Sequence, residues 1–105
     1  MKVLFIISTD DAETMYNALR MANVGIQKGD EVGVFMLGKA VTYESVGGKD
    51  FDVVGQVNQF TEEGDFYVWG VCLQAHGLVA SASCPVAWMD DLYELSMEAD
   101  KVITF

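Results

Sequence analysis

The chain has 105 residues and a mass of 11.5 kDa, which is the size of one domain. Hydrophobic residues make up 51% of it and charged residues 21%, which excludes an intrinsically disordered chain. Six Lys and Arg residues against 16 Asp and Glu residues give a net charge of −10, so we expect no binding to nucleic acid or to anionic membranes.

Hydrophobic patterning predicts a strand, a helix and a second strand in the first third of the chain. Residues 2–8 (KVLFIIS) form a continuous apolar run, typical of a strand buried on both faces. Asp10 and Glu13 fit a capping box at the start of a helix that Gly29 ends. Residues 31–37 (EVGVFML) then predict a strand. The apolar positions of the helix have helical spacing: Met15, Ala18, Leu19, Met21, Ala22 and Ile26.

The middle of the chain is less regular at first. Gly47 and Gly48 interrupt residues 38–50, which are interpreted as a short helix or a mobile loop. Residues 65–71 (DFYVWGV) predict a third strand after a helix that runs up to Gly64. The apolar positions of that helix are Phe51, Val54, Val57 and Phe60.

The last third is predicted to end in a helix and a strand. Residues 72–76 are a short connector that ends at Gly77, and a short fourth strand is expected within residues 78–86. Residues 101–105 (KVITF) predict a terminal strand. The preceding helix has acidic residues in its first turn and scattered apolar positions: Asp90 and Asp91, then Met89, Leu92, Tyr93 and Ala99.

This order predicts a single α/β domain over residues 1–105, with a mostly parallel sheet of four or five strands. Ligands of such sheets bind at the carboxyl ends of the strands. Two loops are expected there, residues 8–11 (STDD) and residues 70–72 (GVC).

Cys72 is the strongest candidate for chemistry. It follows a predicted buried strand, where backbone N–H groups at the start of a turn or helix stabilise a thiolate. His76 lies four residues later, on the same face of a helix, and supports the thiolate when protonated. The alternative is that Cys72 is a packed small hydrophobic residue, since free cysteines are among the most buried residue types.

Cys84 has two interpretations, a resolving thiol that forms a redox-sensing disulfide with Cys72 or an inert packed residue. Cys72, His76 and Cys84 form a C-x3-H-x7-C pattern with no fourth ligand, so we expect no metal site. Asp10 and Asp11 either cap a helix or bind a cation or a substrate. Nucleotide-binding glycine motifs and a GxSxG motif are absent from the sequence, and no cofactor is expected.

Three stretches of the sequence resemble one protein family. They are residues 1–41, residues 66–78 (FYVWGVCLQAHGL) and residues 89–105 (MDDLYELSMEADKVITF). The resemblance is to the DsrE/DsrF-like family of small sulfur-relay proteins, of the YchN and TusD types. Members often read C-G-x-C-L-x-A-R-G in the central stretch. The reactive cysteine of the family falls on Cys72, while Trp69 stands at the first cysteine and His76 at the arginine.

The resemblance implies a three-layer α/β/α fold that assembles into homotrimers or homohexamers. It also implies that Cys72 carries sulfane sulfur as a persulfide, taken from a donor protein and passed to an acceptor protein, without a cofactor. The competing interpretation is an oligomeric small-ligand-binding or scaffold module without covalent chemistry. In either case we expect five residues to line or support the site: Thr9, Asp10, Trp69, Gly70 and Cys84.

The apolar residues also allow predictions about the cellular compartment and the oligomeric state. The longest early apolar run, residues 3–7, is too short for a signal peptide or a membrane span, so we expect a cytoplasmic protein with reduced cysteines. A mean hydropathy of +0.24 in so small a chain favours burial of apolar surface between copies.

Overall fold

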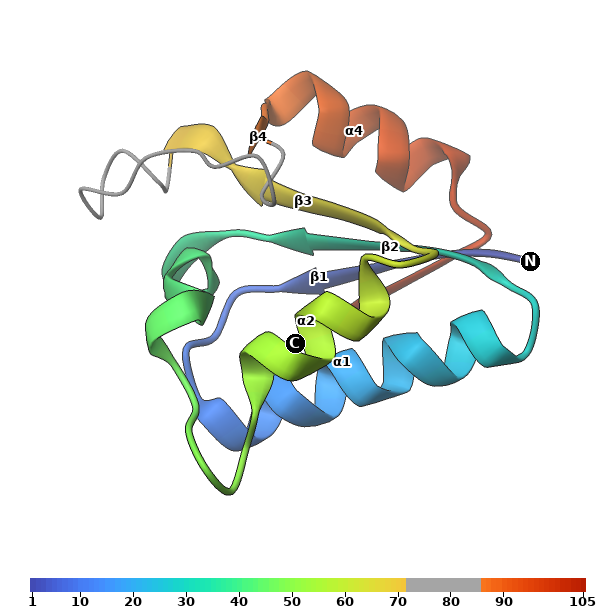
Figure 1. Ribbon diagram of the computed structural model, residues 1–105. Helices are drawn as coiled ribbons and strands as arrows, with labels where there is room; N and C mark the ends of the chain where they lie inside the picture. Colours follow the sequence, from blue (N-terminus) through green and yellow to red (C-terminus); the bar gives the residue numbers. More distant parts are fainter. Residues whose placement is uncertain (72–85) are drawn as a thin grey trace.

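The computed structural model of the chain describes residues 1–71 and 86–105, which form a five-stranded sheet between helices (Figure 1). Its strands are β1 (Lys2–Ile7), β2 (Glu31–Met36), β3 (Asp65–Trp69), β4 (Val86–Ala87) and β5 (Lys101–Thr104). Its described helices are α1 (Ala12–Gln27), the 3-10 helix η1 (Gly38–Ser45), α2 (Val53–Phe60) and α4 (Met89–Glu98). The strand order is β4-β3-β2-β1-β5 and every pair is parallel, so the α/β fold predicted from the sequence is confirmed.

Helices cover both faces of the sheet. Figure 1 shows α1 and α2 on one face and α4 on the other. Successive residues of β1 alternate between these layers: Phe5 and Ile7 pack in the α1–α2 core, whereas Leu4 packs with Leu92 and Leu95 of α4. This double burial explains the unbroken apolar run of β1, because a strand inside a parallel sheet has no polar face.

The first helix begins one residue later than the predicted capping box requires. The N-cap is Asp11, whose Oδ2 accepts hydrogen bonds from the backbone N–H of Thr14 at 3.0 Å and from its hydroxyl at 2.8 Å. The capping box of Asp10 and Glu13 is therefore wrong, because Glu13 lies at the second helical position and not the third. Gly29 follows the helix with a φ of +88°, which confirms it as the helix end.

Other boundaries differ by a few residues. The irregular segment contains η1, so its interpretation as a short helix holds for Gly38–Ser45. β3 ends at Trp69, because Gly70 and Val71 already have helical backbone, whereas the sequence predicted a strand through residue 71. β4 (Val86–Ala87) begins at the last residue of the segment in which a fourth strand was expected, and residues 78–85 lie outside the described residues. The predicted connector over residues 72–76 lies outside the described residues.

The predicted stripe of α1 is only partly buried. Met15, Ala18, Leu19 and Ala22 are in the core, but Met21 is exposed. The buried face also contains a polar residue, Asn23, which the predicted apolar stripe did not include. Its Nδ2 donates to Oε1 of Gln56 at 3.0 Å and to the carbonyl of Gln56 at 3.3 Å, which joins α1 to α2.

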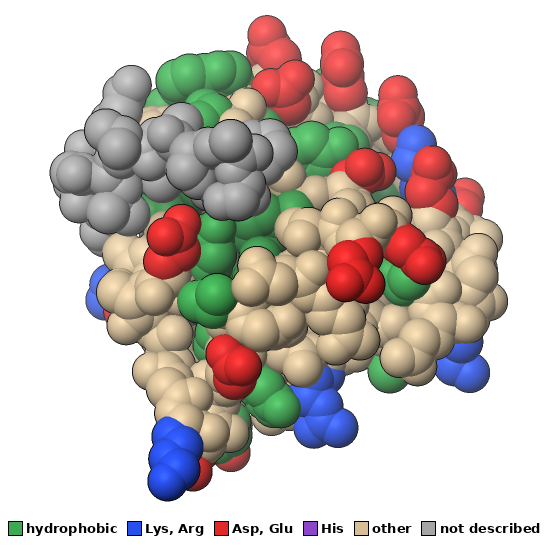
Figure 2. Space-filling view, in the orientation of Figure 1, with side chains coloured by type: hydrophobic (Ala, Val, Ile, Leu, Met, Phe, Trp, Pro, Cys, Tyr) green, Lys and Arg blue, Asp and Glu red, His purple; other side chains and the backbone are tan. Residues whose placement is uncertain are grey.

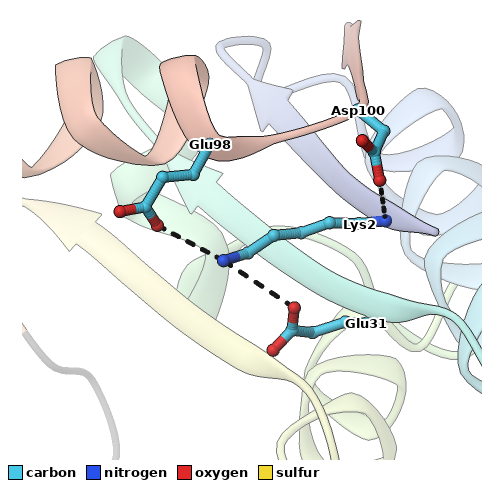
Figure 3. A network of polar contacts seen from close by, with 4 residues as sticks. All are labelled: Lys2, Glu31, Glu98 and Asp100. Carbon is cyan, nitrogen blue, oxygen red and sulfur yellow. Dashed lines mark hydrogen bonds and ion pairs between the residues drawn. The ribbon is translucent and has the colours of Figure 1, made fainter.

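Lys2 ties three elements together at the amino edge of the sheet (Figure 3). Its Nζ lies 3.3 Å from Oε2 of Glu98 and 3.7 Å from Oε2 of Glu31. Its backbone N–H donates to Oδ2 of Asp100 at 2.8 Å. The hydrogen bond that Lys2 donates to Glu98 and the charge of Glu31 raise the pKa of Lys2 above its ordinary value, so the ammonium stays charged at neutral pH.

The corrected cap predicts how stability depends on pH. The two hydrogen bonds from Thr14 lower the folded-state pKa of Asp11 below its ordinary value. Asp11 therefore stabilises the fold above its unfolded pKa, and this contribution disappears as the pH falls through the folded pKa. We expect Asp11→Ala to lower the melting temperature at pH 7 and to converge with the wild type in strong acid. Circular dichroism melts over a pH series measure this, with Asp10→Ala as the neutral control. An equal loss in both variants would contradict the assigned cap.

Candidate functional site

The carboxyl ends of all five strands meet at one edge of the sheet, because every strand pair is parallel. The segment after β1, with Thr9 and Asp10, and the segment after β3, with Gly70, both leave the sheet at this edge. Cys72 comes directly after Val71 in the sequence. Cys72, His76 and Cys84 lie outside the described residues.

The segment after β1 is held by hydrogen bonds. Ser8 donates its backbone N–H, at 2.8 Å, and its hydroxyl, at 3.1 Å, to the carbonyl of Phe105 beyond β5. The hydroxyl oxygen of Thr9 accepts the backbone N–H of Asp11 at 3.1 Å. Thr9 and Asp11 thus fix the start of α1, while the exposed Asp10 lies between them. Of the acids in this loop, Asp11 fills the capping role.

Trp69 and Gly70 lie on the far side of β2 from this segment. The sheet order separates β1 from β3 by two strand spacings, about 9–10 Å. The half-buried Trp69 belongs to the apolar cluster beneath α4, and its buried indole Nε1 has no hydrogen-bond partner among residues 1–71 and 86–105. Thr9 and Asp10 instead lead into α1, on the other face of the sheet. The structure thus places these predicted residues along one edge, but not in one cluster.

Trp88 is a residue of this edge that the sequence analysis missed. It is the N-cap of α4, its backbone N–H donates to Oδ2 of Asp91 at 2.8 Å, and its side chain is 48% exposed. Its ring lies against the backbone of Gly70: a methyl group built there would lie 2.7 Å from Cη2 of Trp88 and 2.7 Å from Cγ1 of Val86. Gly70 is therefore required by close approach of a ring, two residues before Cys72. The sequence does show a glycine, Gly70, directly after a predicted strand. It gives no sign that Trp88, 18 residues later, packs against that glycine.

Opposing electrostatic contributions meet at this edge. α1 and α4 both start here, so the positive dipole ends of their first turns favour anions. Acidic side chains at the same ends offset them: Asp10, Asp11, Glu13, Asp90 and Asp91. A thiolate at this edge is thus stabilised by backbone N–H groups and opposed by neighbouring carboxylates.

We also considered other clefts and side-chain clusters in the described part of the chain as candidate sites. One lies at the amino edge beside Lys2 and Tyr67. Burial, with the nearby charge of Asp65, raises the pKa of Tyr67 above its ordinary value, so its hydroxyl stays protonated at neutral pH. Within residues 1–71 and 86–105, no three His, Cys, Asp or Glu side chains gather as metal ligands would. Over the same residues, no helix has the length and apolar character needed to cross a membrane.

Comparison with known proteins gives one family. Residues 1–105 match the model of the DsrE/DsrF-like family. Among curated proteins, none matches the sequence.

Solved structures share the fold across nearly the whole chain. The ychN protein from E. coli is 20% identical with a TM-score of 0.84, and the match covers 100% of both chains. A protein of unknown function from Bacteroides thetaiotaomicron is 18% identical with a TM-score of 0.78, covering 99% of this chain and 94% of that one. One from Methanobacterium thermoautotrophicum is 17% identical with a TM-score of 0.77, covering 99% and 98%. At these identities the likeness shows the fold alone.

The contact between Gly70 and Trp88 predicts the effect of a single methyl group. Gly70→Ala is expected to destabilise the protein by ~1–3 kcal/mol, as overpacked substitutions do, and to change the fluorescence of the displaced tryptophan. Chemical denaturation measures the free energy of unfolding. Adding Trp88→Ala should reduce the penalty, since it removes one of the two clashing side chains. Gly48→Ala is the matched control, because no atom lies within 4 Å of its new methyl group. Equal effects of the two glycine variants would contradict the packing role of Trp88.

Proposed function

The chain belongs to the DsrE/DsrF-like family, and on that premise we propose that it is a sulfur-relay protein that carries sulfane sulfur as a persulfide on Cys72. The observation that carries this proposal is the end of β3. The backbone turns helical at Gly70 and Val71, directly after Trp69, so the next residue in the sequence follows the first N–H groups of a helical turn. Such N–H groups favour a thiolate, which is the form of cysteine that attacks sulfur.

The transfer needs neither an oxidant nor a cofactor. The thiolate sulfur of Cys72 attacks the outer sulfur of a donor persulfide, R–S–SH, and a new S–S bond forms. The S–S bond of the donor breaks, and its electron pair leaves with the donor as a thiolate. An acceptor thiolate then attacks the outer sulfur on Cys72 and releases the Cys72 thiolate. The partners are therefore a sulfur donor protein and a sulfur acceptor protein, and reduced cysteines of this kind belong in the cytoplasm.

His76 and Trp69 distinguish this chain from the frequent motif of the family. His76 replaces a permanent cation with a group of ordinary pKa near ~6.5, so its support of a thiolate grows as the pH falls. Trp69 stands in place of the first cysteine of the motif, so this element has one thiol and not two, and the Trp69 side chain packs beneath α4. We propose a relay with one sulfur-carrying thiol, in which Thr9, Asp10 and Gly70 support the edge and Cys84 is not required.

Assembly is part of the proposal. We propose that the protein is a homotrimer or a homohexamer. Large apolar side chains exposed on α4 support this, because isolated small proteins seldom leave such stripes uncovered: Met89, Tyr93 and Met97.

A sulfane donor tests the chemistry directly. Protein incubated with glutathione persulfide is expected to gain the mass of one sulfur atom, and peptide mass spectrometry should place it on Cys72. Cys84→Ser should retain the adduct and Cys72→Ser should lose it, while circular dichroism confirms that both variants fold. Dithiothreitol should remove the sulfur.

Two results would argue against this function. An adduct on Cys84 alone would move the chemistry to another thiol. A protein that forms no adduct but binds a small ligand, with an affinity unchanged by Cys72→Ser, would be the non-catalytic binding module.

A further inference from the structure

One stripe of α4 is apolar yet points away from the sheet. Met89, Tyr93 and Met97 recur every four residues and are 54%, 65% and 66% exposed. The sheet is covered instead by Leu92 and Leu95, from a different stripe of the same helix. We call the three exposed residues the α4 patch. A helix with a second apolar stripe beside the one it buries has a surface suited to another protein chain.

A second exposed patch lies on the opposite layer, on α1. Met21 and Val24 are 49% and 45% exposed, and Arg20 and Lys28 flank them on the same outer face of the helix. We call these four residues the α1 patch. The Arg20 guanidinium lies 5.8 Å from the centre of the Tyr16 ring. Within the described residues, neither Arg20 nor Lys28 forms an ion pair with a carboxylate.

The two patches have opposite charge. α4 contains four acidic residues and no basic one, and Asp90 and Glu94 lie beside Tyr93 and Met97 on its outer side. Figure 2 shows acidic side chains gathered over α4, whereas most of the Lys and Arg side chains in view lie along the opposite side of the molecule. Contact between two α4 patches would bring carboxylates together, and contact between two α1 patches would bring cations together. Contact between an α4 patch and an α1 patch joins apolar surfaces with complementary charges at their borders.

We propose that copies of this chain assemble head to tail, with the α4 patch of one copy docked on the α1 patch of the next. Each copy then uses two different surfaces, and such heterologous contacts close into a ring when the rotation between neighbours allows it. The proposal rests on the homo-oligomer proposed above and assigns its contact surfaces. It is independent of the sulfur chemistry of Cys72.

Complementary blocked variants test the direction of the contact. Tyr93→Arg with Met97→Arg blocks the α4 patch by placing cations opposite Arg20 and Lys28. Met21→Glu with Val24→Glu blocks the α1 patch by placing acids opposite those of α4. All four positions are exposed, so the fold should be retained, and circular dichroism checks this. Val54→Glu, at an exposed apolar position of α2 outside both patches, is the matched control.

Sedimentation over a concentration series gives the masses. Each blocked variant alone should be a monomer of about 11.5 kDa, and the control should keep the wild-type mass. An equimolar mixture of the two blocked variants retains one intact patch of each kind, so the two variants should bind each other and the mass should at least double.

Three results would overturn the proposal. A wild-type monomer at every concentration would remove the oligomer itself. A blocked α1 variant that still forms dimers would indicate contact between two α4 patches. A mixture that stays monomeric would show that the two patches do not bind each other. A separate sulfur-loading assay on each variant reports whether persulfide chemistry fails or survives.

Discussion

The parallel alignment of all five strands is the constraint on which the rest of this molecule depends. Since parallel strands all start at the same edge, the chain crosses a face of the sheet at α1, α2 and α4, and these helices cover both faces (Figure 1). The central strands lose every polar face and become continuous apolar runs, as in β1. The carboxyl ends of the strands meet at the opposite edge, where helix N-termini and the segments after β1 and β3 gather. Cys72 is a candidate site residue because it follows β3 in the sequence, and β3 ends at this edge.

Sequence patterns predicted the features that depend on neighbours along the chain. The run of β1, the Gly29 end of α1 and the acidic first turn of α4 are of this kind, since each follows from local backbone chemistry. The N-cap was misplaced by one residue, because Asp10 and Asp11 are adjacent and both suit a cap; the hydrogen bonds from Thr14 select Asp11.

Sequence patterns did not predict the features that depend on contacts between residues distant in the sequence. The spacing of apolar residues indicates that a helix has an apolar stripe. When a helix has two such stripes, the spacing does not indicate which of them packs against the sheet. Thus Met21 on α1 and Tyr93 on α4 are exposed although each fitted an apolar pattern. The close approach of Trp88 to Gly70 joins β3 to α4, and it arises only when β4 pairs beside β3. The burial of Asn23 likewise depends on Gln56 of α2.

Sulfur transfer by Cys72 requires an activated thiol, and the pKa of that thiol is the property to measure. The measurement is the pH dependence of iodoacetamide labelling, followed at Cys72 and Cys84 by peptide mass spectrometry, with denatured protein as reference. We expect a labelling midpoint for Cys72 well below the ~8.5 of a free thiol. A Cys72 that resists labelling until the protein unfolds would contradict this expectation and would make this cysteine a packed residue of the core.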